Sequence, residues 1–424
     1  MAQPVNILFF IDHRVREMDC LTAVARLLNQ KGLTTAFVPL RGETYHSLTS
    51  YTPDIACFTW FYFHENSGFN RIRRYWPNAR YVNLAFEQSV NEINKNLKAP
   101  KHPYVVKEVW QSSWTFAWDE ELGRRGVPDN RREVNGHPVM ALYQEPYSTL
   151  YPTKEVLAKQ FNLDLTKRWI LIPENFNPAF HGPEKVDEYV AAGEDRGEIE
   201  AYFQWARDSL DALVDWLMAT PDDVELIFRP RPGIGMKAYQ ERFGERLNHF
   251  PKSVKMIDDL TVREWILASD VVASNLSTSL MESALAGKDT FVIAPLPFPD
   301  RVMIDWQSKV TQIQTKDQYL GALDGSFKGD PTELADWVKS TMMPVGDPIA
   351  KLADWLAEVH KEAMALPKPL GPLGTKIRSK ELDFKSWKRK TKLKLKGGYQ
   401  LPPVDVFSDE DIAARGRDWQ RILG

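Results

Sequence analysis

The chain has 424 residues, a formal net charge of −3 and 43% hydrophobic residues, enough for the cores of two or three ordered domains. Its two cysteines, Cys20 and Cys57, lie in apolar segments without metal-ligand spacing, which predicts buried thiols in a reducing compartment and excludes a disulfide framework. The sequence shows no signal peptide and no stretch near the roughly 20 apolar residues of a spanning helix. We therefore expect a cytoplasmic protein.

The first part of the chain alternates strand and helix patterns. A continuous apolar run from Val5 to Ile11 ends in the polar Asp12, as expected of a central parallel strand. A helical stripe follows, and two more apolar runs at 54–60 and 80–86 predict further strands. This alternation predicts a parallel α/β domain over residues 1–152, which ends in a proline-rich link.

A second alternating unit follows the link. Strand patterns open at Lys167, Val224, Val271 and Thr290, with helical patterns between them. We predict a second parallel-sheet domain over 153–345 and C-terminal helices with a basic tail over 346–424. The predicted fold class is therefore α/β, with two Rossmann-like domains.

An arginine turn, defined as Arg229 to Gly235, follows the apolar strand at Val224–Phe228. Its prolines stiffen the turn, and a guanidinium matches phosphate oxygens in pairs. Arginines beside prolines are also typical of a solvated loop, and that alternative stays open for the turn read alone. Because ligands collect at the carboxyl ends of parallel strands, we favour phosphate binding by Arg229 and Arg231.

A hydroxyl-rich serine turn follows the apolar residues 271–273 and leads into a helical pattern. The first N–H groups of a helix are unpaired and carry the positive end of its dipole, which suits an anion. Simple N-capping by a hydroxyl is the alternative. The residues that we assign to phosphate and donor binding here are Ser274, Ser277, Thr278, Ser279 and Glu282.

These two turns resemble the C-terminal half of GT-B glycosyltransferases of surface and capsular polysaccharide assembly, especially capsule-type Kdo transferases and CDP-glycerol glycerophosphotransferases. The resemblance implies two sheet domains facing a cleft and a nucleotide-sugar donor, with no other cofactor. In those families an Arg/Lys-Pro-His-Pro turn and a hydroxyl-rich helix start bind the donor phosphate, and an acidic residue such as Glu282 often holds the ribose. Arg231 stands where the family has histidine, which leaves the donor open.

The resemblance implies a glycosyltransferase that moves a sugar from a CMP-, CDP- or other nucleotide-activated donor to a polysaccharide or lipid-linked glycan. Two alternatives remain. A CDP-glycerol-type phosphotransferase would use the same turns but transfer phosphorus. A non-catalytic glycan-binding protein would have no physical reason to concentrate cations and hydroxyls in this way.

The catalytic carboxylate or histidine of such an enzyme is expected in the first domain. Glu87 directly follows the predicted strand that ends at Phe86, and we consider it the first candidate for a general base. His64, Glu65 and Asp12 also follow predicted strands and are the further candidates. Each of the four could equally be an N-cap or a loop salt bridge.

Metal chemistry has little support, because the eight histidines are scattered and neither a His-x-x-x-His nor a Cys-x-x-Cys pair occurs. Asp258 and Asp259 precede a predicted helix, where capping explains them. We therefore expect a metal-independent enzyme in which arginines and a helix dipole neutralise the phosphate.

A basic tail, defined as residues 376–398, carries ten Lys and Arg against Glu381 and Asp383, with Leu, Phe and Trp between them. This pattern suits an anionic membrane surface, since each basic residue contributes about 1 kcal/mol near one. A tail that folds back on the acidic body of the protein explains the charges equally well. We expect peripheral contact with the inner face of the cell membrane or such an internal contact, and no nucleic-acid partner.

Overall fold

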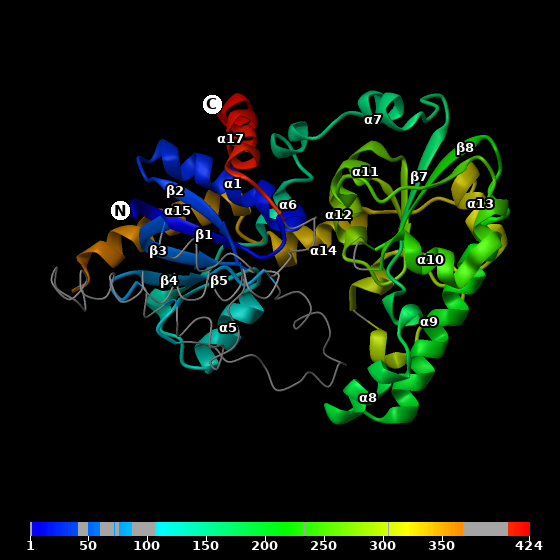
Figure 1. Cartoon of the computed structure of the whole chain (residues 1–424), viewed down its shortest axis with the longest axis horizontal. Coiled ribbons are helices and arrows are strands. Elements are labelled where there is room, and N and C mark those ends of the chain that lie inside the picture. Colours follow the sequence, from blue (N-terminus) through cyan, green and yellow to red (C-terminus); the bar gives the residue numbers. More distant parts are fainter. Residues whose placement is uncertain are drawn as a thin grey trace, which may run out of the picture. The chain divides into compact units, whose positions relative to one another are not determined.

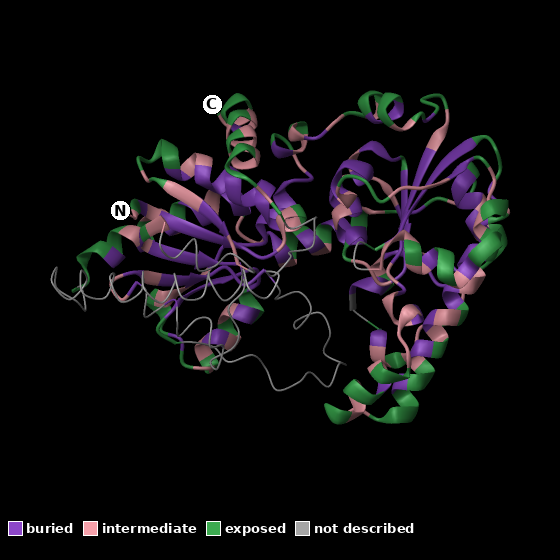
Figure 2. Cartoon of the chain, viewed as in Figure 1, coloured by how far each residue is buried: buried purple, intermediate pink, exposed green. Residues whose placement is uncertain are grey.

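The computed structural model describes residues 2–40, 50–59, 72, 76–86, 107–231, 234–303, 305–367 and 406–424. These residues form two compact units, each with its own parallel sheet (Figure 1). The first unit takes its described residues from 2–150 and 340–424, and the second from 151–339. In both units the strands are buried and the exposed residues lie mainly on helices and loops (Figure 2).

The first unit contains a six-stranded sheet in the order β2-β1-β3-β4-β5-β6, and every neighbouring pair is parallel. The apolar run that predicted the first strand is buried from Ile7 to Ile11, as a strand covered on both faces requires. The strands are β1 (Gln3–Ile11), β2 (Thr35–Pro39), β3 (Tyr51–Phe58), β4 (Arg80–Asn83), β5 (Trp110–Ser113) and β6 (Arg132–Val134).

Helices from both ends of the chain complete the first unit. Helix α1 packs against α6, α15 and α17, and the described residues from 340 onward belong to this unit. The apolar faces of the C-terminal helices pack on α1, and a contact between such distant segments cannot be read from the linear sequence. The helices are α1 (Arg14–Gln30), α5 (Phe116–Arg124), η1 (Asp129–Arg131), α6 (Pro138–Ala141), η2 (Tyr147–Leu150), α15 (Pro348–Ala365) and α17 (Asp409–Leu423).

The second unit contains a parallel six-stranded sheet in the order β12-β11-β10-β7-β8-β9. Its strands are β7 (Arg168–Pro173), β8 (Val224–Arg229), β9 (Val254–Met256), β10 (Val271–Ser274), β11 (Asp289–Ile293) and β12 (Thr311–Ile313). The main core packs α9, α10 and α13 against these strands.

The helices of the second unit alternate with its strands along the chain, starting with α7 before β7 and ending with α13 after β12. They are α7 (Lys154–Phe161), η3 (Asn177–Phe180), α8 (Pro183–Ala191), α9 (Arg196–Leu217), α10 (Gly235–Phe243), η4 (Gly244–His249), α11 (Val262–Ala268), α12 (Ser279–Leu285), η5 (Asp300–Val302), η6 (Asp305–Lys309) and α13 (Lys316–Asp324). Helix α14 (Thr332–Met342) runs across the boundary between the two units.

Both sheets reverse their strand order beside their first strand. In the second unit the chain runs from β7 through β8 to β9 on one side and then returns to place β10 on the other side of β7. The equivalent reversal in the first unit lies between β1 and β3. Such switch points are where parallel sheets bind ligands, at the carboxyl ends of the strands. The predicted fold class, α/β with two Rossmann-like parallel-sheet domains, is confirmed.

Candidate functional site

Three neighbouring strands of the second sheet end at one cross-linked group of polar residues. Asn175 follows β7, Arg231 follows β8 and Asn275 follows β10. The backbone N–H of Asn175 donates to Oδ1 of Asn275 at 3.0 Å, and Nη1 of Arg231 donates to Oδ1 of Asn175 at 2.8 Å. Asn175 Nδ2 also donates to the carbonyl of Leu276 at 3.2 Å. Asn175 therefore joins the arginine turn to the serine turn across the switch point.

Asn275 offers a buried donor at this edge. The residue is 1% exposed, and its Nδ2 has no hydrogen-bond partner among the residues that the structure describes. Because buried polar groups in proteins are nearly always hydrogen-bonded, an orphan amide requires an explanation. A ligand oxygen at the carboxyl ends of β7 and β10 would supply the acceptor.

The two arginines of the turn have different roles. Arg229 is 4% exposed, and its guanidinium donates to four successive backbone carbonyls, of which those of Asp258 and Asp259 lie at 3.2 and 2.6 Å. Burial lowers the pKa of Arg229, against the opposing effect of nearby carboxylates. Arg231 is exposed and contacts Asn175. The fold thus places Arg231 at the shared strand edge and uses Arg229 to hold the loop at 257–260.

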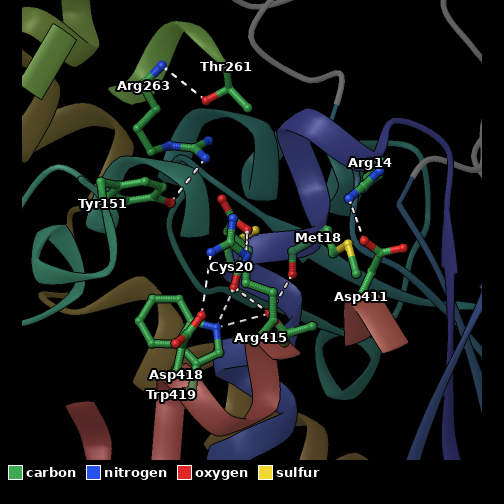
Figure 3. Close-up of polar contacts among 12 residues, drawn as sticks. Arg14, Met18, Cys20, Tyr151, Thr261, Arg263, Asp411, Arg415, Asp418 and Trp419 are labelled. Atoms are coloured by element: carbon green, nitrogen blue, oxygen red, sulfur yellow. Dashed lines mark hydrogen bonds and ion pairs between the residues drawn. The ribbon is translucent and has the colours of Figure 1, made fainter. Parts of the chain in front are cut away.

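The capping role expected of Asp258 and Asp259 is wrong. Helix α11 begins after Thr261, whose side chain accepts the N–H of Arg263 at 3.2 Å while Glu264 accepts the N–H of Thr261 at 3.0 Å (Figure 3). A Thr three residues before a Glu forms this capping box, a signal present in the sequence. The two aspartates instead lend their carbonyls to Arg229.

The serine turn is partly structural. Ser274 is buried, and its Oγ donates to the carbonyl of Pro173, which ties β10 to β7. Ser277 Oγ accepts the N–H of Ser279 at 3.2 Å and its hydroxyl at 2.8 Å. Thr278 is the N-cap residue of α12 and makes no side-chain capping bond with the described part of the chain. Glu282 lies in the first turn of the same helix and is half-buried.

A buried acid that the sequence reading missed supports this edge. Glu174 is 4% exposed, and its carboxylate accepts the hydroxyl of Tyr239 and the N–H of Phe176. Burial raises the pKa of Glu174, while these hydrogen bonds and the charge of Arg231 lower it. Glu174 directly precedes Asn175, so it fixes the backbone that carries the central residue of the site. Its only sequence signal is a carboxylate at the end of an apolar strand.

Replacing Glu174 by Gln is expected to change the pH dependence of stability. A carboxyl whose pKa is raised by folding stabilises the folded state when protonated, and this contribution is lost as the pH rises from about 4.5 through the folded pKa. The free energy of unfolding of Glu174→Gln should therefore fall less steeply than that of the wild type over this window. Urea unfolding at several pH values measures both slopes, and equal slopes would contradict the expectation.

At the switch point of the first sheet, Asp12 follows β1 as predicted. Its side chain is 1% exposed and its Oδ2 lies 3.5 Å from Nε2 of His13. Glu17 is fully buried and accepts the N–H groups of Asp12 and His13 at 2.8 and 3.1 Å. Burial raises the pKa of Glu17, and its ion pair with Arg16 opposes this. Glu17 therefore shapes the loop that presents Asp12.

The carboxyl edge of the first sheet also carries a buried polar band, which sequence reasoning missed. Asn83 on β4 donates to Oε1 of Gln111 at 2.9 Å, and Asn135 donates to Oγ of Ser112 at 3.0 Å. The sequence indicates this band only through isolated polar residues at the ends of short strands. The other catalytic candidates, Glu87, His64 and Glu65, lie outside the described residues, as does the basic tail.

Among the described residues, no group of three or more His, Cys, Asp and Glu side chains could hold a metal ion. The same residues contain no helix with the length and apolar character needed to cross a bilayer. Both cysteines are buried thiols, and burial raises the pKa of Cys57 well above its usual value.

No protein-family model matches the chain, and no curated protein matches its sequence. Solved structures do match it over most of its length. The wall teichoic acid polymerase TagF, in a crystal soaked with CDPG, aligns at 12% identity and a TM-score of 0.51, over 86% of this chain and 91% of TagF. A UDP-N-acetylglucosamine 2-epimerase structure from Listeria monocytogenes aligns at 13% identity and 0.51, over 86% and 98%. MnaA from S. aureus with UDP aligns at 12% and 0.51, over 87% and 100%. At these identities the likeness shows the fold.

Proposed function

We propose that this protein is a glycosyltransferase that uses a nucleotide-activated sugar and acts on a surface polysaccharide or lipid-linked glycan. The observation that carries the proposal is the convergence of Arg231, Asn175 and Asn275 at the switch point of the second sheet. A guanidinium and a buried amide donor suit the oxygens of a phosphate. TagF and MnaA, which share the fold, have been solved with CDPG and with UDP.

The residues of the serine turn have different roles in this proposal. The side chain of Thr278 makes no capping bond with the described part of the chain, and we assign its hydroxyl to the donor phosphate. The N–H groups of the first residues of α12 are already bonded to Ser277 and Thr278. Ser277 and Ser279 hold the turn through their mutual bond. Glu282, one turn into the helix, is assigned to the ribose hydroxyls. The enzyme is proposed to need no metal, since Arg231 supplies the positive charge.

Replacing Arg231 by Ala is expected to weaken nucleotide binding by about 1.5–3 kcal/mol, because a charge-assisted hydrogen bond to phosphate is left unmade. The measurement is the thermal stabilisation of the protein by CMP, CDP, UDP and GDP, which grows with affinity for the folded state. Arg246→Gln is the matched control, since Arg246 lies in the same unit and forms a surface ion pair with Asp215. If Arg231→Ala bound every nucleotide as tightly as the wild type does, the assignment of this site would be overturned.

A CDP-glycerol-type phosphotransferase is the second candidate, and the presence of TagF among proteins of this fold favours keeping it. It would place its nucleotide on the same residues, so binding does not separate the two reactions. Product analysis does: a glycosyltransferase releases the nucleotide and forms a glycosidic bond, whereas the phosphotransferase forms a new phosphodiester.

The basic tail at 376–398 is proposed to bring the enzyme to an anionic membrane, where lipid-linked acceptors reside. Deleting it is expected to abolish co-sedimentation with vesicles that contain anionic lipid at low salt, because about 1 kcal/mol is lost for each basic residue. Nucleotide binding by the deletion variant serves as the control and should not change. Vesicle binding that survives the deletion would place the membrane contact elsewhere.

A further inference from the structure

The buried acid Glu174 is bonded to the turns after β7 and β8, which carry Asn175 and Arg231. Its main-chain N–H donates to the carbonyl of Arg229 at 3.0 Å, which aligns the ends of the two strands. One carboxylate oxygen accepts the N–H of Phe176, the residue after Asn175. Burial raises the pKa of Glu174, and a hydrogen bond from the backbone of Arg231 is among the contacts that lower it. A single side chain thus holds the backbone on both sides of the hydrogen bond between Arg231 and Asn175.

Helix α10 completes this arrangement. The carbonyl of Arg231 accepts the N–H groups of Ile234 and Gly235 at 2.9 and 3.3 Å, so the arginine turn is bonded to the start of α10. About one helical turn further along, the hydroxyl of Tyr239 donates to the other carboxylate oxygen of Glu174. The ring of Tyr239 is fully buried in the core of the second unit, which fixes the position of this hydroxyl.

The three partners of this carboxylate are all donors. Burial and the charge of Glu174 raise the pKa of Tyr239 far above its usual value, with Arg242 acting in the opposite direction, so the phenol keeps its proton. The other two partners are backbone N–H groups, which only donate. An ionised carboxylate accepts from all three, whereas a protonated carboxyl presents its own proton at one oxygen and must give up a contact. Among the described residues, the titratable and charged groups that act on Glu174 are Tyr239 and Arg231.

We propose that Glu174 is a positioning residue of the nucleotide site, and that its ionised carboxylate keeps Arg231 and Asn175 in the geometry that binds phosphate. Glu174 is 4% exposed and both of its oxygens already accept hydrogen bonds, so it acts through the two turns without touching the ligand. The inference rests on the proposed function and deepens it, because nucleotide affinity then depends on a proton held behind the site.

The first test compares Glu174→Gln and Tyr239→Phe with the wild type at pH 8. Calorimetric titration uses whichever of CMP, CDP, UDP and GDP stabilises the wild type most. Glutamine has the same shape, but its amide nitrogen is a donor. Affinity of Glu174→Gln should therefore fall about 10-fold or more, the scale of a charge-assisted hydrogen bond, and that of Tyr239→Phe about 3-fold or more.

Tyr319→Phe is the matched control. It removes another buried phenol hydroxyl of the same unit, which lies 2.7 Å from Oγ1 of Thr220, before β8. Because this hydroxyl has no contact with Glu174, nucleotide affinity should change by less than about 2-fold. Should Glu174→Gln fail to fold, Tyr239→Phe decides the question, since it keeps the buried ring: unchanged affinity in that variant overturns the proposal.

The pH profile separates positioning from a purely structural role. The advantage of the wild type over Glu174→Gln should be complete at high pH and should disappear as the pH falls through the folded-state pKa of Glu174, which is raised above 4.5, because both side chains are then neutral. Protonation of the nucleotide phosphate affects both proteins alike and cancels in the ratio of their affinities. Circular dichroism restricts the comparison to pH values at which both are folded. A ratio that stays constant with pH overturns the proposal.

A double variant tests whether Glu174 acts through Arg231. In Arg231→Ala, adding Glu174→Gln should weaken binding by less than about 3-fold, because the group that Glu174 positions is already absent. A second loss as large as the first overturns the proposal. If Arg231→Ala weakens binding and Glu174→Gln does not, the nucleotide site stands and this inference fails. If the wild type binds none of the four nucleotides, the proposed function fails first.

Discussion

Replacing Glu87 by Gln is expected to lower turnover by about 10²–10⁴ while donor binding stays nearly unchanged. The substitution keeps the shape of the side chain and removes the base that would accept the proton of the acceptor hydroxyl. In the sequence, Glu87 follows Phe86 shortly after β4 ends at Asn83, and α/β domains expose working groups after the carboxyl ends of their strands. Turnover is measured with a nucleotide-sugar and a competent acceptor.

The backbone that leads to this position is held in a costly conformation. Ala85 is fully buried and has a φ of 54°, in the left-handed region that side chains rarely adopt. Its N–H donates to Oδ1 of Asn83 at 3.0 Å, and the N–H of Phe86 donates to the carbonyl of Thr59 at 2.6 Å. Such a residue costs about 1–3 kcal/mol and persists where the surrounding structure over-determines it, often at functional sites.

Three matched variants control this prediction. His64→Gln, Glu65→Gln and Asp12→Asn remove the other candidate groups, and each should retain far more turnover than Glu87→Gln. Near-normal turnover of Glu87→Gln would transfer the role to one of the three. If Glu87→Gln lost thermal stability together with activity, Glu87 would instead be a structural carboxylate.

The two sheets could be predicted from the sequence because parallel strands covered on both faces leave continuous apolar runs. The runs at Val5–Ile11 and Val224–Phe228 correspond to β1 and β8, and both are buried along these stretches apart from the half-buried Asn6. Strand order could not be predicted in the same way. The position of β10 beside β7 depends on pairing between segments about 100 residues apart, and no local pattern encodes it.

The positions of both turns after strand ends could be predicted, but the roles of their residues could not. Arg229 and Arg231 are alike in sequence, yet one is buried among backbone carbonyls and the other is exposed at the strand edge. Residues two apart in a strand share one face, so alternation does not separate these two arginines. The carbonyls that capture Arg229 come from a loop about 30 residues later. Asn175 and Asn275 were missed because a single amide after a strand is also an ordinary turn residue.

The docking of the C-terminal helix was also outside the reach of sequence patterns. Helix α17 contacts α1, near the opposite end of the chain (Figure 3). Arg415 Nε lies 2.8 Å from Oδ1 of Asp19, and Arg14 Nη2 lies 2.8 Å from Oδ1 of Asp411. Arg14 follows the loop that presents Asp12, so the C-terminal helix braces the start of α1 at the first switch point.

Trp419 makes the central contact of this helix. Its side chain is fully buried, and its Nε1 donates to Oγ1 of Thr22 at 3.0 Å and to the carbonyl of Asp19 at 3.2 Å. Its ring meets that of Tyr147 edge-on, with centroids 5.9 Å apart. A buried indole with its N–H satisfied combines a large apolar area with a directional bond. The ion pairs around it are partly exposed and contribute much less.

Replacing Trp419 by Ala is therefore expected to lower the free energy of unfolding of the first unit by about 3–5 kcal/mol, through lost burial and an unfilled cavity. Trp419→Phe keeps most of the ring and loses the indole donor, so it should cost only about 1–2 kcal/mol. Urea unfolding followed by circular dichroism measures both variants. Arg417→Gln, which removes an exposed contact with Glu410 on the same helix, is the control. Removing a buried indole from a packed interface costs more than about 1 kcal/mol. A smaller cost for Trp419→Ala would therefore contradict the docking of α17 through this residue.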